Sequence, residues 1–88
     1  MKTADILEAL ESAGYEGTKV FTDDEYAGAF LGVSDDGRAV YDYDLMVAGL
    51  VAEGMSEEEA MEWIDYNTIR SLPYEHGEAP IVVHKLEI

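Results

Sequence analysis

The residues of this chain that could do chemistry are carboxylates, two histidines and a few serines. Asp42 and Asp44 lie two residues apart, a spacing at which two carboxylates can share Mg²⁺ or Ca²⁺. The same position suits the N-cap of a helix, because an apolar helical pattern begins directly after Asp44. Helix capping is the simpler interpretation of the pair. A metal-dependent or hydrolytic enzyme that uses these carboxylates is the alternative.

Other catalytic and metal-binding patterns are missing from the sequence. His76 and His84 are the only histidines, and a zinc site would need two more ligands. Cysteine is absent, no serine lies in a G-x-S-x-G context, and no glycine-rich phosphate loop occurs. We therefore predict no enzyme activity, no catalytic residue, no metal site and no cofactor.

The net charge is the strongest feature of the composition. Twenty Asp and Glu residues against five Lys and Arg give a formal charge of −15 in 88 residues. Such a charge repels nucleic acid and anionic lipid, and it attracts basic proteins. We therefore predict no direct binding of nucleic acid or membrane, and a basic protein as the partner. The alternative is that the acidity only keeps the protein soluble.

Three helices must position these carboxylates. The first is predicted from about Asp5 to Ala13, with Thr3 as its N-cap and Gly14 just after its end. The second opens at residues 42–44 and runs to about Glu53. Its apolar residues cover so much of its circumference that we expect it to be the central helix.

The third predicted helix begins at a capping box, with Ser56 as N-cap and Glu59 three residues later, and runs to about Arg70. Its inward face is expected to hold Ala60, Met61, Trp63, Ile64, Asn67 and Thr68. Ile69 falls, by the 100° spacing of an α-helix, on the opposite and acidic side. Either the helix ends before Ile69, or Ile69 contacts the following loop or a partner.

The outward side of this helix is the candidate partner-binding surface. We call it the binding row, and its members are Glu58, Glu59, Glu62, Asp65, Tyr66 and Ile69. A rigid line of carboxylates can imitate a phosphate backbone and occupy the nucleic-acid-binding cleft of a basic protein. The alternative is an ordinary solvated helix face.

Strand signals complete the fold prediction. Residues 29–33 and 39–41 flank an Asp-Gly turn, which is typical of a β-hairpin. A weak signal near Val20 suggests an extra strand, and Pro80–Leu86 is predicted as a last strand buried on both faces. The order α-β-β-α-α-β predicts an α+β fold, in a single domain over residues 1–88. Its three- or four-stranded sheet is antiparallel or mixed, with helices packed on one face.

Cellular location follows from what the chain lacks. Its longest apolar run spans residues 45–52, whereas a membrane-spanning helix needs about 20 residues. The first residues show neither the apolar stretch nor the cleavage site of a signal peptide. These observations predict a cytoplasmic protein.

A series of short motifs between residues 41 and 74 adds a family resemblance. It consists of Tyr-Asp-Tyr-Asp at 41–44, Glu-Glu-Ala at 58–60, Glu-Trp-Ile at 62–64, Tyr-Asn-Thr-Ile-Arg at 66–70 and Leu-Pro-Tyr at 72–74. Over roughly residues 30–83 the chain resembles a family of short acidic proteins of bacterial and phage genomes, often on mobile elements. The resemblance implies a bacterial or phage origin and favours an inhibitor of host defence. It implies no catalytic residue or cofactor.

Taken together, these features predict a small acidic protein-interaction module, with a nucleic-acid mimic as its specific form. Two alternatives stay open beside it. One is the carboxylate- or metal-dependent enzyme. The other is a structural homo-oligomer without catalytic role, formed through an apolar patch near Ile69 and Tyr74.

Overall fold

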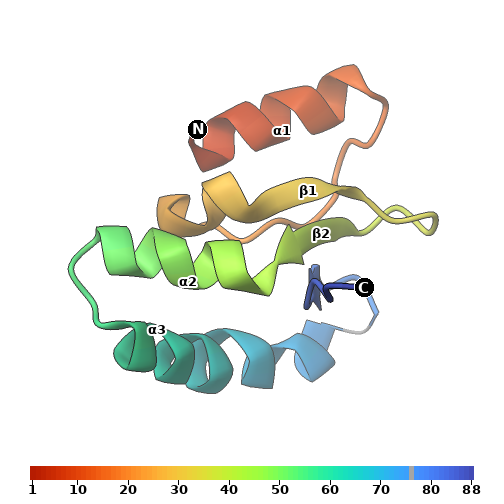
Figure 1. Cartoon of the computed structure of the whole chain (residues 1–88). Helices are drawn as coiled ribbons and strands as arrows, with labels where there is room; N and C mark the ends of the chain where they lie inside the picture. The colour runs from red at the N-terminus through yellow and green to blue at the C-terminus, as the bar shows by residue number, and fades with distance from the viewer. Residues whose placement is uncertain (76) are drawn as a thin grey trace.

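The computed structural model describes residues 1–75 and 77–88, which fold into an α+β domain (Figure 1). Its elements in chain order are α1 (Thr3–Ser12), η1 (Asp24–Ala29), β1 (Phe30–Val33), β2 (Ala39–Asp42), α2 (Tyr43–Ala52), α3 (Glu57–Trp63), η2 (Ile64–Thr68), η3 (Ile69–Glu75) and β3 (Ile81–Val83). η1 and η3 are 3₁₀ helices, and η2 is a π-helical turn. The predicted order of long helices and strands is therefore present, with short helical segments added.

The described residues form one mixed sheet with the strand order β1-β2-β3. β1 and β2 are antiparallel and form the predicted hairpin, in which the amide of Ser34 donates to the carbonyl oxygen of Arg38 at 2.8 Å. Gly37 supplies the left-handed turn residue, with φ of 83°. A bulge shifts the register between Phe30 and Gly32. β3 lies parallel to β2 on its other side.

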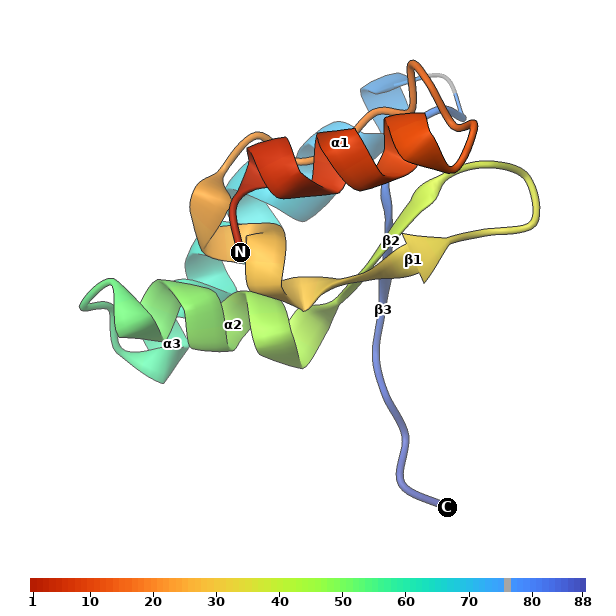
Figure 2. The ribbon, with the colours of Figure 1, turned by 90° about the horizontal axis from the view of Figure 1, so that it is seen from above.

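β3 is shorter than the strand predicted over Pro80–Leu86. Only Ile81–Val83 pair with β2, because β2 ends at Asp42 and offers no partner to the residues beyond. These three residues are half-buried, and residues 84–88 leave the body as an extended, exposed segment (Figure 2). The prediction of a strand that reaches Leu86 and is buried on both faces is therefore wrong.

The segment before η1 is a loop and not a strand. The amide of Phe21 donates to the hydroxyl of Tyr41 at 3.2 Å. The Phe21 ring packs on those of Tyr26 and Tyr41, with centroid distances of 5.6 and 4.7 Å. Because a side chain takes the hydrogen bond that a neighbouring strand would make, the loop is held without joining the sheet. The prediction of an extra strand near Val20 is wrong.

α1 starts earlier than predicted, since Lys2 and not Thr3 is its N-cap. The amide of Thr3 donates to the Asp24 carboxylate at 2.9 Å, and its hydroxyl donates to the carbonyl oxygen of Thr22 at 3.4 Å. Thr3 therefore ties the start of α1 to η1 and the loop before it. Gly14 follows the helix with φ of 90°, as its predicted position requires.

The hydrophobic core lies between the sheet, η1, α2 and α3. Its buried members are Tyr26, Ala29, Ala39, Tyr41, Tyr43, Met46, Val47, Leu50, Ala60 and Ile64. A smaller cluster of Ile6, Leu10 and Ala27 attaches α1. α2 contacts η1, α3 and β2, so it is the central helix that its apolar pattern predicted. Among the described residues, no helix has the length and apolar character needed to cross a membrane.

Candidate functional site

The predicted third helix is divided into α3, the π turn η2 and the start of the 3₁₀ segment η3. α3 begins at the predicted capping box: the Ser56 hydroxyl accepts the Glu59 amide at 3.1 Å, and the Glu59 carboxylate accepts the Ser56 amide at 3.2 Å. These hydrogen bonds hold the pKa of Glu59 below its ordinary value. A π turn contains more residues than an α turn, so η2 rotates every later side chain backward about the helix axis.

Ile69 shows the effect of this rotation. A regular α-helix would place it on the acidic side, whereas in the structure it is half-buried and packs against the core. It therefore continues the buried line of Ala60 and Ile64. η2 ends at Thr68 and the 3₁₀ segment η3 begins at Ile69, so the alternative that the helix ends before Ile69 is borne out. Ile69 does not lie on the outward face with the other members of the binding row.

α3 and η2 bury a narrower stripe than the predicted inward face. The buried residues are Ala60, Ile64 and Thr68. At 3.6 residues per turn, Met61 and Trp63 lie about 100° and about 60° to either side of Ala60, and they are 42% and 47% exposed. Asn67 is exposed as well, and its side-chain amide donates to the carbonyl oxygen of Trp63 at 3.2 Å. These three residues therefore lie at the surface and not inside.

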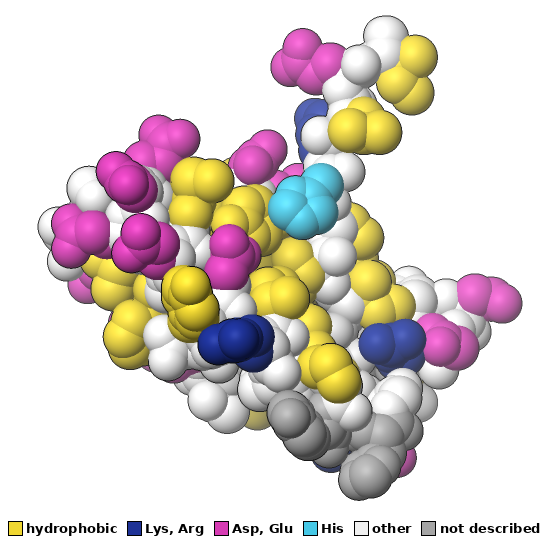
Figure 3. Space-filling model, turned by 90° about the horizontal axis from the view of Figure 1, so that it is seen from below, with side chains coloured by type: hydrophobic (Ala, Val, Ile, Leu, Met, Phe, Trp, Pro, Cys, Tyr) yellow, Lys and Arg dark blue, Asp and Glu magenta, His cyan; other side chains and the backbone are white. Residues whose placement is uncertain are grey.

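The remaining members of the binding row, Glu58, Glu59, Glu62, Asp65 and Tyr66, are all exposed. Acidic side chains gather over the α3 end of this face (Figure 3). Asp65 accepts the Tyr43 hydroxyl at 3.2 Å. Burial, and then the charge of Asp65, raise the pKa of Tyr43. The Arg70 guanidinium lies 5.1 Å from the centre of the Tyr66 ring.

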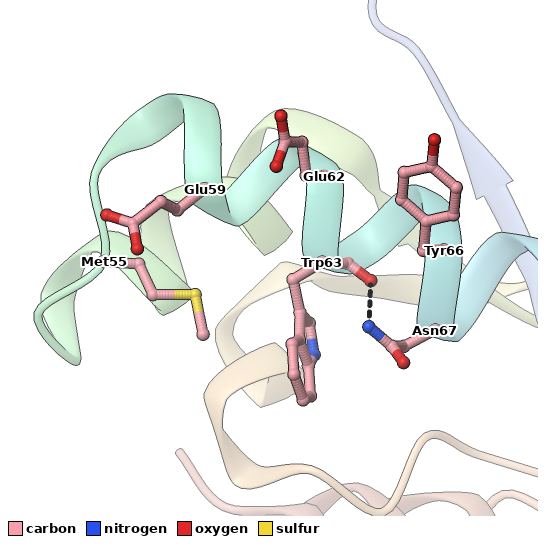
Figure 4. Close-up of a pocket in the computed structure, with 6 residues that line it drawn as sticks. All are labelled: Met55, Glu59, Glu62, Trp63, Tyr66 and Asn67. Carbon is pink, nitrogen blue, oxygen red and sulfur yellow. Dashed lines mark hydrogen bonds between the residues drawn. The ribbon is translucent and has the colours of Figure 1, made fainter.

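A shallow hollow of about 320 Å³ opens on the surface of α3 and η2. Its lining residues are Met55, Glu59, Glu62, Trp63, Tyr66 and Asn67. Figure 4 shows Glu62 and Tyr66 on one side of the helix and Trp63 on the other, with the Glu59 carboxylate beside Met55. The hollow thus brings together Glu59, Glu62 and Tyr66 of the binding row. Glu58 and Asp65 lie outside it.

A second hollow of about 210 Å³ adjoins the first. Its lining residues are Asp23, Glu25, Tyr26, Leu50, Glu53, Met55 and Trp63. Trp63 and Met55 border both hollows, with Glu59 and Glu62 in the lining of the first and Asp23, Glu25 and Glu53 in the lining of the second. Within residues 1–75 and 77–88, no lysine or arginine lines either hollow. The site therefore combines an exposed aromatic ring with negative charge on two sides.

Asp23 and Glu25 in the second hollow repel each other. Burial, and then the charge of Glu25, raise the pKa of Asp23 above its ordinary value. Both effects disfavour the ionised form of Asp23. A positive group placed in this hollow would offset them, so its electrostatics favour a cation.

Sequence reasoning found only part of this site. It missed Trp63, although Glu59 precedes it by four residues and Tyr66 follows it by three, and such neighbours share a helix surface. No sequence pattern indicated that Asp23 and Glu25 lie near Trp63, because only the packing of η1 against α2 brings them there.

The carboxylates and histidines that were considered as possible metal ligands do not form a metal site among the described residues. The Asp42 carboxylate accepts the Leu45 amide at 3.0 Å and caps α2, while Asp44 is exposed. The His84 ring lies against the Tyr43 ring, with a centroid distance of 4.5 Å, and His76 lies outside the described residues. In the part of the chain that the structure describes, no three His, Cys, Asp or Glu side chains are grouped to hold a metal ion.

Comparison with known proteins adds no relative of established function. The resemblance of residues 30–83 to short acidic bacterial and phage proteins therefore stays a prediction. No protein-family model, no curated protein and no solved structure matches this chain.

Proposed function

We propose that this protein is an interaction module that binds a basic protein through the surface of α3 and η2. One observation carries the proposal: Trp63 is 47% exposed and borders two hollows that are lined by carboxylates. Large aromatic residues are enriched in interfaces, where they supply buried apolar area. The carboxylates around the ring define the charge of the partner that would cover it.

The negative charge of the protein and the Trp63 ring contribute to binding in different ways. The net charge of −15 steers a basic partner toward the protein and speeds association. Exposed ion pairs add only about 0–1 kcal/mol each, so they cannot supply most of the affinity. Burial of Trp63 and Tyr66 supplies the larger share, as aromatic anchors do at other interfaces.

Nucleic-acid mimicry is the specific form of binding that we propose. Five carboxylates lie between Glu57 and Asp65, over about 12 Å of helix axis. This is roughly one charge per 3 Å, close to the one per ~3.4 Å along a single DNA strand. A basic protein that binds nucleic acid matches this charge density. In the cytoplasm of a bacterium, whether the protein is of bacterial or phage origin, the module would keep such a protein away from its nucleic acid.

A salt-gradient pull-down from bacterial lysate tests the proposal. The baits are the wild type, a Glu58→Lys/Glu62→Lys variant, and a Glu8→Lys/Glu11→Lys control. The control makes the same charge change at exposed positions of α1. We expect the wild type and the control to retain a basic protein that the α3 variant loses. We also expect moderate salt to release it and nucleic acid to compete for it.

Two results would contradict the proposal. The first is a complex that resists salt, since charge would then not hold it together. The second is equal loss of the partner from both double variants, which would mean that net charge and not the α3 surface matters.

A further inference from the structure

We propose that the two hollows beside Trp63 bind arginine side chains of the basic partner, with a guanidinium stacked on the indole and paired with the carboxylates around it. This inference rests on the proposed function, and it adds the chemical group that the site selects.

The arrangement of ring and carboxylates matches the shape of a guanidinium. This group is planar and weakly hydrated, so its face can stack on an aromatic ring while its edge donates two hydrogen bonds to a carboxylate. At Trp63 the ring borders both hollows. Glu59 and Glu62 line one of them, and Asp23, Glu25 and Glu53 line the other. Glu62 lies on the other side of the helix from the indole (Figure 4). The acceptors for a guanidinium on the indole are therefore Glu59 in the first hollow and Asp23, Glu25 and Glu53 in the second.

A lysine side chain would use the same site less well. Its ammonium group is a compact and strongly hydrated charge that neither stacks nor forms a planar bidentate pair. The carboxylates attract both cations, because Asp23, Glu25 and Glu53 line the second hollow and Glu59 lines the first. The preference for arginine therefore depends on the ring.

The protein already holds one guanidinium on an aromatic ring of this surface. Arg70 lies 5.1 Å from the centre of the Tyr66 ring, within the ~6 Å that a cation–π contact allows. Tyr66 also lines the first hollow. One aromatic ring of the site is thus engaged by the protein's own arginine, while the indole of Trp63 borders both hollows.

The native fluorescence of the protein gives a direct test, because Trp63 is its only tryptophan. The probes are hexa-arginine and hexa-lysine peptides with blocked ends, which carry the same charge. Each is titrated against the wild-type protein at low and at physiological salt, with calorimetry as a second readout. We expect hexa-arginine to change the Trp63 emission and to bind at least about fivefold more tightly than hexa-lysine.

Two variants test which side chains produce the preference for arginine over lysine. Trp63→Leu keeps an apolar side chain but removes the ring, so calorimetry should show similar affinities for the two peptides. Glu59→Gln/Glu62→Gln should weaken both peptides, and glutamine at position 59 keeps the capping box. Its control, Glu8→Gln/Glu11→Gln, removes equal charge from α1 and should weaken them much less. Circular dichroism checks that each variant is folded.

The outcomes separate this inference from the proposed function. Equal affinity of the two peptides for the wild type overturns the arginine inference and leaves the basic partner in place. A preference for arginine that survives Trp63→Leu in a folded protein also overturns it. If neither peptide binds and the lysate yields no salt-sensitive partner, both proposals fail. The comparison of the two peptides on the wild-type protein tests the preference for arginine even if a variant does not fold.

Discussion

Among single residues, Gly49 determines how closely α2 approaches η1. A Cβ atom at this position would overlap the carbonyl oxygen of Glu25. That oxygen belongs to the backbone of η1, which carries the buried residues Tyr26, Ala27 and Ala29 and cannot easily move aside. Close packing therefore favours glycine here, although glycine inside a helix costs roughly 0.5–1 kcal/mol relative to alanine.

We expect Gly49→Ala to lower the free energy of unfolding by about 1–3 kcal/mol, the usual cost of overpacking. Urea unfolding followed by circular dichroism measures the change. Gly28→Ala is the matched control, because no atom outside its own segment of the chain lies within 4 Å of a Cβ built at Gly28. The control should alter stability little. A Gly49→Ala protein more stable than the wild type would show that α2 and η1 can separate without cost.

Among the elements, α3 depends on the capping box at its first turn. The Glu59 carboxylate accepts the Ser56 amide, and this hydrogen bond lowers the pKa of Glu59 in the folded protein. A lowered pKa means that ionised Glu59 stabilises the fold above its unfolded pKa, near the ordinary value of 4.5. This contribution is lost as the pH falls through the lower folded pKa.

We therefore expect Glu59→Gln to be less stable than the wild type at neutral pH, because an amide oxygen is a weaker acceptor than a carboxylate. The deficit should shrink as the pH falls through the folded pKa of Glu59. Urea unfolding of both proteins over this range measures the difference. Glu58→Gln removes a neighbouring charge without removing a cap. If it shows the same pH-dependent deficit, net charge and not the cap is responsible.

The elements with local signals at their ends could be predicted from sequence. Asp42 caps α2, Ser56 and Glu59 cap α3, and Gly37 forms the hairpin turn. Each of these signals acts within a few residues, so tertiary structure is not needed to recognise it. The end of β3 could not be predicted in this way, because it depends on where β2 ends in space.

The π turn had no signal of this kind, and it changed the interpretation of the site. η2 allows both Ile64 and Ile69 to face the core, which a 100° spacing does not allow. The exposed carboxylates of the binding row were predictable, since acidic residues of an amphipathic helix face water. The position of Trp63 was not, because it lies at the edge of a buried stripe whose width the neighbouring elements determine.

At the scale of the whole molecule, charge and size together determine the response to salt. The principal extents are 37 × 30 × 26 Å, while the Debye length is about 30 Å at 0.01 M salt and about 8 Å at 0.15 M. At the lower concentration most carboxylates repel one another across the molecule. At 0.15 M salt, only neighbouring carboxylates repel one another appreciably. A net charge of −15 therefore destabilises the fold mainly at low salt.

We expect NaCl to raise the melting temperature between these two concentrations. Each ~1 kcal/mol of relieved repulsion corresponds to about 4–8 °C for a domain of this size. Differential scanning calorimetry measures the shift. The Glu8→Gln/Glu11→Gln variant has less negative charge, so its melting temperature should rise less with salt. A melting temperature that is flat or falls with salt would mean that repulsion between carboxylates does not limit stability.

The junction of β2 and α2 has a mechanical consequence. Asp42 is the last residue of β2 and also the N-cap of α2, which begins at Tyr43. No slack segment separates strand from helix, so tension along β2 passes directly into the first turn of α2. β2 is also the strand that joins both neighbours of the sheet. When the chain is pulled from its two ends, sheet and central helix should yield in one rupture.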